Sequence, residues 1–201
     1  MTDATLQDAI EAEYETELSR LGSSKSLYAL TGGELETDAV LAALADAAAT
    51  AAATFEDWTD DPEAGDLFLE AAETGREHAD RIAESADEAE PVDAPTPADE
   101  VLRGLQSPAA RLGGLLAWTL LTDETLAQGV GFFVGNADPK AADRFRDLRS
   151  DVAELRERTL DVLEEADDEA ARAAASDVVE AAYAHYANTL EGMGVKVKPV
   201  C

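Results

Sequence analysis

Few residues of this 201-residue chain have both a side chain that could bind a metal or transfer a proton and a position that faces the interior. His78 is the first of these candidates. It lies at helical spacing from Phe68, Ala71 and Ile82, so we expect its imidazole to face the interior of a helical bundle. An inward-facing histidine can be a metal ligand or a pH-sensitive group, but it is more often a hydrogen-bonded core residue. We expect the core role for His78, with the ligand role as the alternative.

Glu124 is the second candidate, because it interrupts an otherwise apolar helical segment. Ala117, Leu120 and Ala127 surround it at helical spacing. A carboxylate in such a place needs a partner or a proton, since an unpaired buried charge is costly. We expect the head of Glu124 to reach water at the edge of its helix. The alternative is a polar contact with His78 inside the bundle.

The remaining polar residues form no recognisable catalytic arrangement. Serines that are close to a histidine in sequence have no oriented third group, and no glycine-rich turn follows a strand. The carboxylates are too numerous for one pair to be singled out. His185, flanked by Tyr183 and Tyr186, is expected to lie at the surface of the bundle. We therefore expect no catalytic residue and no cofactor.

Helices must position these candidates. Apolar residues recur at i, i+3, i+4 and i+7 along almost the whole chain, whereas alternation with period two is rare, and this pattern predicts an all-α fold. We expect a single helical domain over residues 1–201. Its core helices are expected at about 37–58, 62–86, 108–134 and 139–165, with a linker over 87–107 and flanking helices over 4–21 and 169–193.

Three of the expected helices begin with a proline that follows a capping residue, at Pro62, Pro108 and Pro139. The core helices then form two pairs with short turns, and one long proline-rich connection crosses between the pairs. This is the connectivity of ferritin-like four-helix bundles. We therefore expect a ferritin-like bundle, with the first and last helices packed outside its four-helix core.

Residues 68–81 resemble the second bundle helix of rubrerythrins, which belong to the ferritin-like superfamily. The resemblance implies a di-iron site, to which this helix contributes a Glu-x-x-His motif. His78 falls on the ligand histidine, but Gly75 stands where the ligand glutamate belongs. The resemblance therefore implies a degenerate metal site with His78 and Glu124 as its remnant, and iron or manganese as the alternative to a chain without cofactor.

Other carboxylates are expected in solvent rather than at a metal site. Asp46 falls on the side of its helix that points away from the apolar seam. Glu154 continues a polar strip that also contains Asp151, and Glu157 stands three residues later, where a ligand histidine would be expected. These positions leave the expected di-iron ligand set incomplete.

The net charge of the chain indicates the solvent in which the protein works as well as the partners that it can bind. With 44 Asp and Glu against 15 Lys and Arg, the net charge is −29. Such a chain repels itself in dilute buffer, whereas at about 1 M salt the Debye length falls to roughly 3 Å. We therefore expect the protein to work in the cytoplasm of a halophile.

We do not expect the chain to bind duplex nucleic acid, because its Lys and Arg residues form no cluster. The sequence shows no signal peptide and no apolar run long enough to span a membrane, so we expect the protein not to associate with a membrane.

Two segments favour a protein partner or self-association. Phe132 and Phe133 lie among glycines. Glycines lower the stability of a helix, and close packing of that helix against a neighbour would offset this cost. The end of the chain is apolar and basic on an acidic protein, with Lys196, Lys198 and Cys201 as its candidate contact residues. A homodimer is one arrangement that these segments would serve.

Together these observations predict a non-catalytic scaffold or protein-interaction protein. The first alternative is a rubrerythrin-like di-metal oxidoreductase with an altered ligand set. The glycine-flanked pair of phenylalanines and the Lys-Pro-Val-Cys end also resemble a small group of haloarchaeal rubrerythrin-like proteins sometimes labelled transcription antitermination proteins. That resemblance implies a second alternative, a transcription-associated factor.

Overall fold

The computed structural model describes residues 5–84, 95–164 and 168–197. Within these ranges the chain is helical and has no strand, which confirms the all-α prediction. The helices are α1 (Leu6–Glu13), α2 (Glu15–Leu21), α3 (Lys25–Leu30), α4 (Thr37–Glu56), α5 (Gly65–Ala83), α6 (Pro97–Gly104), α7 (Pro108–Gly135), α8 (Pro139–Leu163) and α9 (Asp168–Gly192). The four long helices expected for the core correspond to α4, α5, α7 and α8, with end points that differ by up to three residues.

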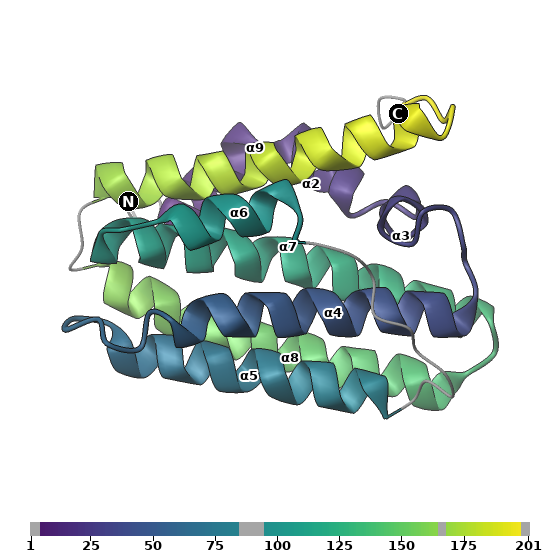
Figure 1. Ribbon diagram of the computed structural model, residues 1–201, viewed down its shortest axis with the longest axis horizontal. Helices are drawn as coiled ribbons and strands as arrows, with labels where there is room; N and C mark the ends of the chain where they lie inside the picture. Colours follow the sequence, from purple (N-terminus) through teal and green to yellow (C-terminus); the bar gives the residue numbers. More distant parts are fainter. Residues whose placement is uncertain (1–4, 85–94, 165–167, 198–201) are drawn as a thin grey trace.

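Two helix hairpins make up the centre of the molecule. α4 packs along α5, α7 packs along α8, and α5 contacts α8 (Figure 1). Large aromatic side chains fill the space between the hairpins, since the rings of Phe55 and Trp118 meet edge to face with centroids 5.1 Å apart. Phe55 is fully buried, so this contact lies in the core.

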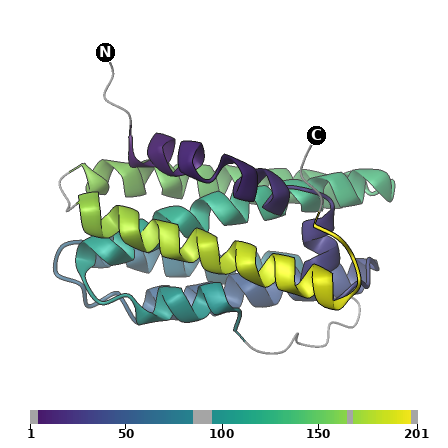
Figure 2. The ribbon, with the colours of Figure 1, turned by 90° about the horizontal axis from the view of Figure 1, so that it is seen from above.

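A further layer covers α7. α9 packs on α7 and α6, and Figure 2 shows α1 and α2 running alongside α9. Gly113 permits the approach of α7 to α9, because a Cβ at this position would overlap the backbone of Ala171. The short α6 lies between α9 and α4 (Figure 1).

Local capping signals fix the starts of α7 and α8 as predicted. Ser107 Oγ accepts a hydrogen bond from the Ala110 backbone N–H at 3.2 Å, and Asp138 Oδ1 accepts one from Ala141 at 2.9 Å. Each of these caps precedes a proline at the first helical position. The two starts are therefore encoded by their own sequence.

The prediction that Pro62 opens a helix is wrong, because α5 begins three residues later at Gly65. Asp61 stabilises a turn instead. Its Oδ1 accepts hydrogen bonds from the backbone N–H groups of Glu63 and Ala64 at 3.1 and 3.2 Å. Its Oδ2 pairs with Arg111 at 3.2 Å, so a partner from α7 holds this buried carboxylate.

The expected first helix is also divided. A break at Tyr14 separates α1 from α2, and α3 lies between the segments expected to form helices at 4–21 and 37–58. Tyr14 is buried, and its hydroxyl donates a hydrogen bond to Glu180 Oε1 of α9 at 2.8 Å. This contact with α9 lies at the point where the helix is interrupted.

α4 is the one described helix that is long and apolar enough to cross a membrane by length and composition alone. Half of its apolar window is buried inside the bundle. Core helices of globular proteins have the same composition. The absence of a membrane-spanning segment stays a prediction.

Candidate functional site

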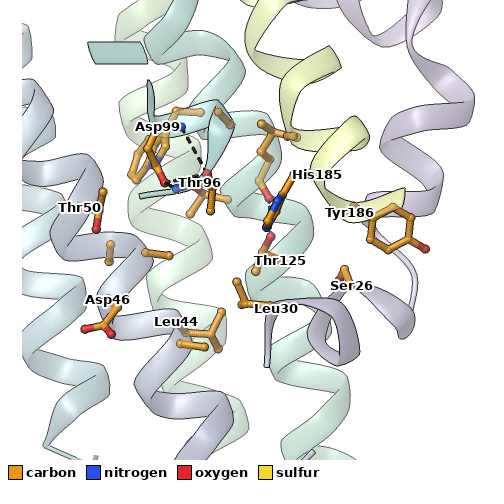
Figure 3. Close-up of a pocket in the computed structure, with 18 of the residues that line it drawn as sticks. Ser26, Leu30, Leu44, Asp46, Thr50, Thr96, Asp99, Thr125, His185 and Tyr186 are labelled. Carbon is orange, nitrogen blue, oxygen red and sulfur yellow. Dashed lines mark hydrogen bonds between the residues drawn. The ribbon is translucent and has the colours of Figure 1, made fainter. Parts of the chain in front are cut away.

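A cavity of about 870 Å³ lies between α4 and the layer of α7 and α9 (Figure 3). α3 and α6 also contribute to its wall, α5 contributes two residues, and α2 contributes Leu21. Small-molecule sites typically occupy roughly 300–1,000 Å³ and are mainly apolar. This cavity fits that description, because alanine and leucine are the most frequent residues of its lining. Examples are Ala43, Leu44, Ala47, Leu102, Leu121 and Leu126.

Both histidines of the chain line this cavity, although they lie 107 positions apart in the sequence. His78 reaches it from α5 and is 2% exposed, as expected for a core residue. His185 reaches it from α9 and is exposed, and Figure 3 shows its ring close to Thr125 of α7. Sequence reasoning placed His185 at the surface and missed its place beside a cavity, because that cavity exists only once six other helices are assembled.

His78 contacts Asp151, a residue expected in solvent. Its Nε2 lies 3.3 Å from Asp151 Oδ2, and the guanidinium of Arg81 donates to the same oxygen at 2.8 Å. Burial lowers the pKa of His78, and the contact with Asp151 raises it in part. Because burial is the larger effect, the fold favours the neutral imidazole.

Glu124 lies elsewhere. It packs beside Gly22 at the end of α2, where the adjacent Gln128 side chain donates a hydrogen bond to the Gly22 carbonyl oxygen. Burial raises the pKa of Glu124, and the neighbouring carboxylate of Asp123 raises it further. Within the described ranges, no hydrogen bond or ion pair joins Glu124 to His78, so the structure does not bring these two candidates together.

The donor set does not fit a di-iron or di-manganese centre. The described residues contain no group of three or more His, Cys, Asp or Glu side chains placed to hold a metal ion. At Gly75, where the rubrerythrin resemblance puts a ligand glutamate, even a Cβ would lie 2.9 Å from Ala52 Cβ and 3.1 Å from the Ala48 carbonyl oxygen. α4 and α5 are too close together there for a carboxylate side chain.

Asp46 was expected in solvent, but it is half-buried and lines the cavity. It has an interaction partner of its own. Asp99, at the α6 side, accepts hydrogen bonds from the backbone N–H and the hydroxyl of Thr96, both at 2.7 Å (Figure 3). Both carboxylates in the described lining are therefore already engaged.

Ser26 is different. Its Oγ is buried and has no hydrogen-bond partner among the described residues, while the residue lines the cavity from α3. Two neighbouring hydroxyls do have partners, since Thr125 donates to the Leu121 carbonyl oxygen at 2.9 Å and Tyr186 lies 3.4 Å from Ser23 Oγ. Sequence reasoning gave no signal for Ser26, because its environment depends on tertiary packing.

The residues that we expected to contact a partner differ in their exposure to solvent. Phe133 is 1% exposed and packs on Phe145 with ring centroids 5.1 Å apart, so it belongs to the core. Phe132 is half-buried beside it, and the adjacent Val134 is 55% exposed.

At the end of the chain, the backbone oxygen of Lys196 accepts a hydrogen bond from Lys25 Nζ at 3.0 Å. This contact holds the described end of the chain against the start of α3. The candidates Lys198 and Cys201 lie outside the described residues.

An apolar chamber with one orphan hydroxyl and engaged carboxylates is suited to holding a molecule. The contact of His78 with Asp151 lies on the α5 side of this cavity, and His185 lines its α9 side. No family model, no curated protein and no solved structure matches this chain.

Proposed function

We propose that this chain is a non-catalytic helical scaffold that binds a small, mostly apolar molecule between α4 and α9. The cavity of about 870 Å³ is the observation that carries the proposal. Its apolar lining would gain stability by covering an apolar ligand, since each buried methylene contributes about 0.8 kcal/mol. Trp118, which is 7% exposed, adds a large aromatic surface to the wall.

The scaffold that we propose is a ferritin-like bundle of α4, α5, α7 and α8. Support comes from the two hairpins and from the long connection between them, which contains α6. At Gly75, where a metal centre of that family would need a glutamate, the approach of Ala52 leaves no room for a carboxylate side chain. On this proposal the cavity replaces a metal centre as the binding site, and the net charge of −29 adapts the scaffold to a salt-rich cytoplasm.

A protein partner is compatible with this scaffold. Phe132 and Val134 leave apolar surface at the end of α7, away from the lining of the cavity. We propose this end of α7 as the contact that a partner or a second copy would use.

The binding function is tested with an uncharged solvatochromic dye, Nile red, titrated into the full chain at high potassium chloride concentration. We expect saturable fluorescence enhancement. Ala47→Trp should abolish most of it, because Ala47 is an exposed residue of the cavity wall and an indole there would fill the cavity. Ala53→Trp is the matched control, since Ala53 is an exposed alanine of the same helix that does not line the cavity. Equal effects of the two substitutions would overturn the proposal.

The degenerate metal site has its own test. Elemental analysis of chain purified without chelator or histidine tag should give far less than one iron or manganese per chain, and His78→Ala should not change the value. Two metal ions per chain, lost on substitution, would establish the di-metal alternative instead.

A further inference from the structure

The orphan hydroxyl of Ser26 marks one position in the cavity where a ligand would be recognised. A buried hydroxyl without a partner lowers the stability of the fold, and a ligand oxygen placed next to it removes that cost. Among the described residues, only Arg20 Nε and Ser26 Oγ are buried side-chain atoms without a partner, and only Ser26 lines the cavity. The polar end of a bound ligand would therefore lie beside α3.

The charges around the cavity restrict what that polar end can be. None of the described lining residues is Lys or Arg, so an anionic head group would meet no permanently charged cation there. The net charge of −29 adds to its repulsion. A cationic head group is not required either, because Asp99 is engaged by Thr96 and Asp46 has a partner of its own. The one buried polar side-chain atom of the described lining that has no partner is a neutral hydroxyl, Ser26 Oγ.

We infer that the cavity selects an uncharged amphiphile, an aliphatic or isoprenoid molecule with a hydroxyl or carbonyl oxygen that hydrogen-bonds to Ser26 Oγ. The apolar part extends between α4 and α7 toward Trp118. This inference rests on the proposed binding function and adds the class of ligand. It also agrees with a lining whose described carboxylates are engaged and which contains no described Lys or Arg.

The experiment compares four ligands that share one chain length: 1-decanol, 2-decanone, decanoate and decyltrimethylammonium. Trp58→Phe leaves Trp118, in the cavity wall, as the single tryptophan of the full chain and therefore as the reporter. Titrations are run at high potassium chloride concentration, which suppresses non-specific charge effects. We expect the alcohol and the ketone to saturate the signal, and each charged ligand to bind at least about tenfold more weakly, because its charge loses water without gaining a partner.

Ser26→Ala in the same background should weaken binding of decanol by about three- to tenfold, which is the range for loss of one neutral hydrogen bond. The variant should fold, because it removes a hydroxyl that has no described partner. Ser24→Ala is the matched control, since Ser24 is an exposed serine two residues away that does not line the cavity. It should bind decanol as the parent chain does.

The outcomes separate the two proposals. If decanoate or decyltrimethylammonium binds as tightly as decanol, or if Ser26→Ala binds decanol unchanged, the inference about the head group is wrong while the binding function stands. If no amphiphile binds and Nile red also gives no signal sensitive to Ala47→Trp, the binding function itself fails and the inference fails with it.

Discussion

His78 Nε2 and Asp151 Oδ2 lie 3.3 Å apart, and this contact joins α5 to α8 behind the cavity. Two opposing influences act on the imidazole. Burial lowers the pKa of His78, whereas the carboxylate raises it, and burial is the larger of the two. The pair therefore links the stability of the bundle to pH through a histidine that the fold keeps neutral.

Lowering the pH should destabilise the fold through His78. Because the pKa of His78 in the fold lies below its ordinary value of 6.5, the unfolded chain binds the proton more tightly. The stabilising contribution is complete above pH 6.5 and is lost as pH falls from 6.5 through the lower folded pKa. Melting temperatures from pH 7.5 to 5.5 should decline in the parent chain and decline less in His78→Gln.

His185→Gln is the control for this measurement, because His185 is exposed and lies on α9, away from the contact of His78 with Asp151. It should keep the pH dependence of the parent chain. A variant His78→Gln with the parent's full dependence would place the titrating group elsewhere.

Glu124→Gln should raise the melting temperature at pH 7 by about 1–3 °C. Burial and Asp123 raise the pKa of Glu124, so its ionisation destabilises the fold as pH rises from the ordinary 4.5 through the folded pKa. The gain from glutamine should accordingly shrink toward pH 4.5. Glu157→Gln makes the same change in net charge at an exposed position and should gain less. Equal gains from both variants would indicate a general charge effect.

Two glycines of α7 should respond to alanine in opposite directions. A Cβ at Gly129 would lie 2.6 Å from Phe145 Cδ1, so Gly129→Ala should lower the free energy of unfolding by about 1–3 kcal/mol. A Cβ at Gly131 would meet nothing within 4 Å, so Gly131→Ala should raise it by roughly 0.5–1 kcal/mol through helix propensity. Chemical denaturation measures both, and a stabilised Gly129→Ala would contradict the close packing of α7 on α8.

Salt should stabilise the chain. With a net charge of −29, the folded state repels itself at low ionic strength, and screening at about 1 M potassium chloride removes much of that repulsion. The melting temperature should rise between about 0.1 and about 1 M potassium chloride. A melting temperature that stays constant over this range would show that repulsion between surface carboxylates is not a significant term.

The features that could be predicted from the sequence are those encoded locally. Ser107 and Asp138 cap their helices because the cap, the following proline and the first turn are adjacent in the chain. The interior position of His78 follows from its helical phase. The break at Tyr14 could not be predicted in this way, because the contact made there is with Glu180 on α9.

The cavity could not be predicted for a related reason. One side of α4 packs closely against its neighbour, as Ala52 does against Gly75. The other side, with Ala47, is left open by α9, which packs on α7 and α6 instead. Helical phase alone gives the faces of a helix, whereas the neighbours decide which face is covered.

The hydrogen bond from Lys25 Nζ to the Lys196 backbone oxygen bears on which end of the chain should carry a tag or a surface attachment. Lys25 immediately precedes Ser26 in α3, so a fusion partner or surface attachment at the carboxyl end would pull on the cavity wall. α1 contributes no described residue to that wall. Affinity tags and biosensor linkages therefore belong at the amino end.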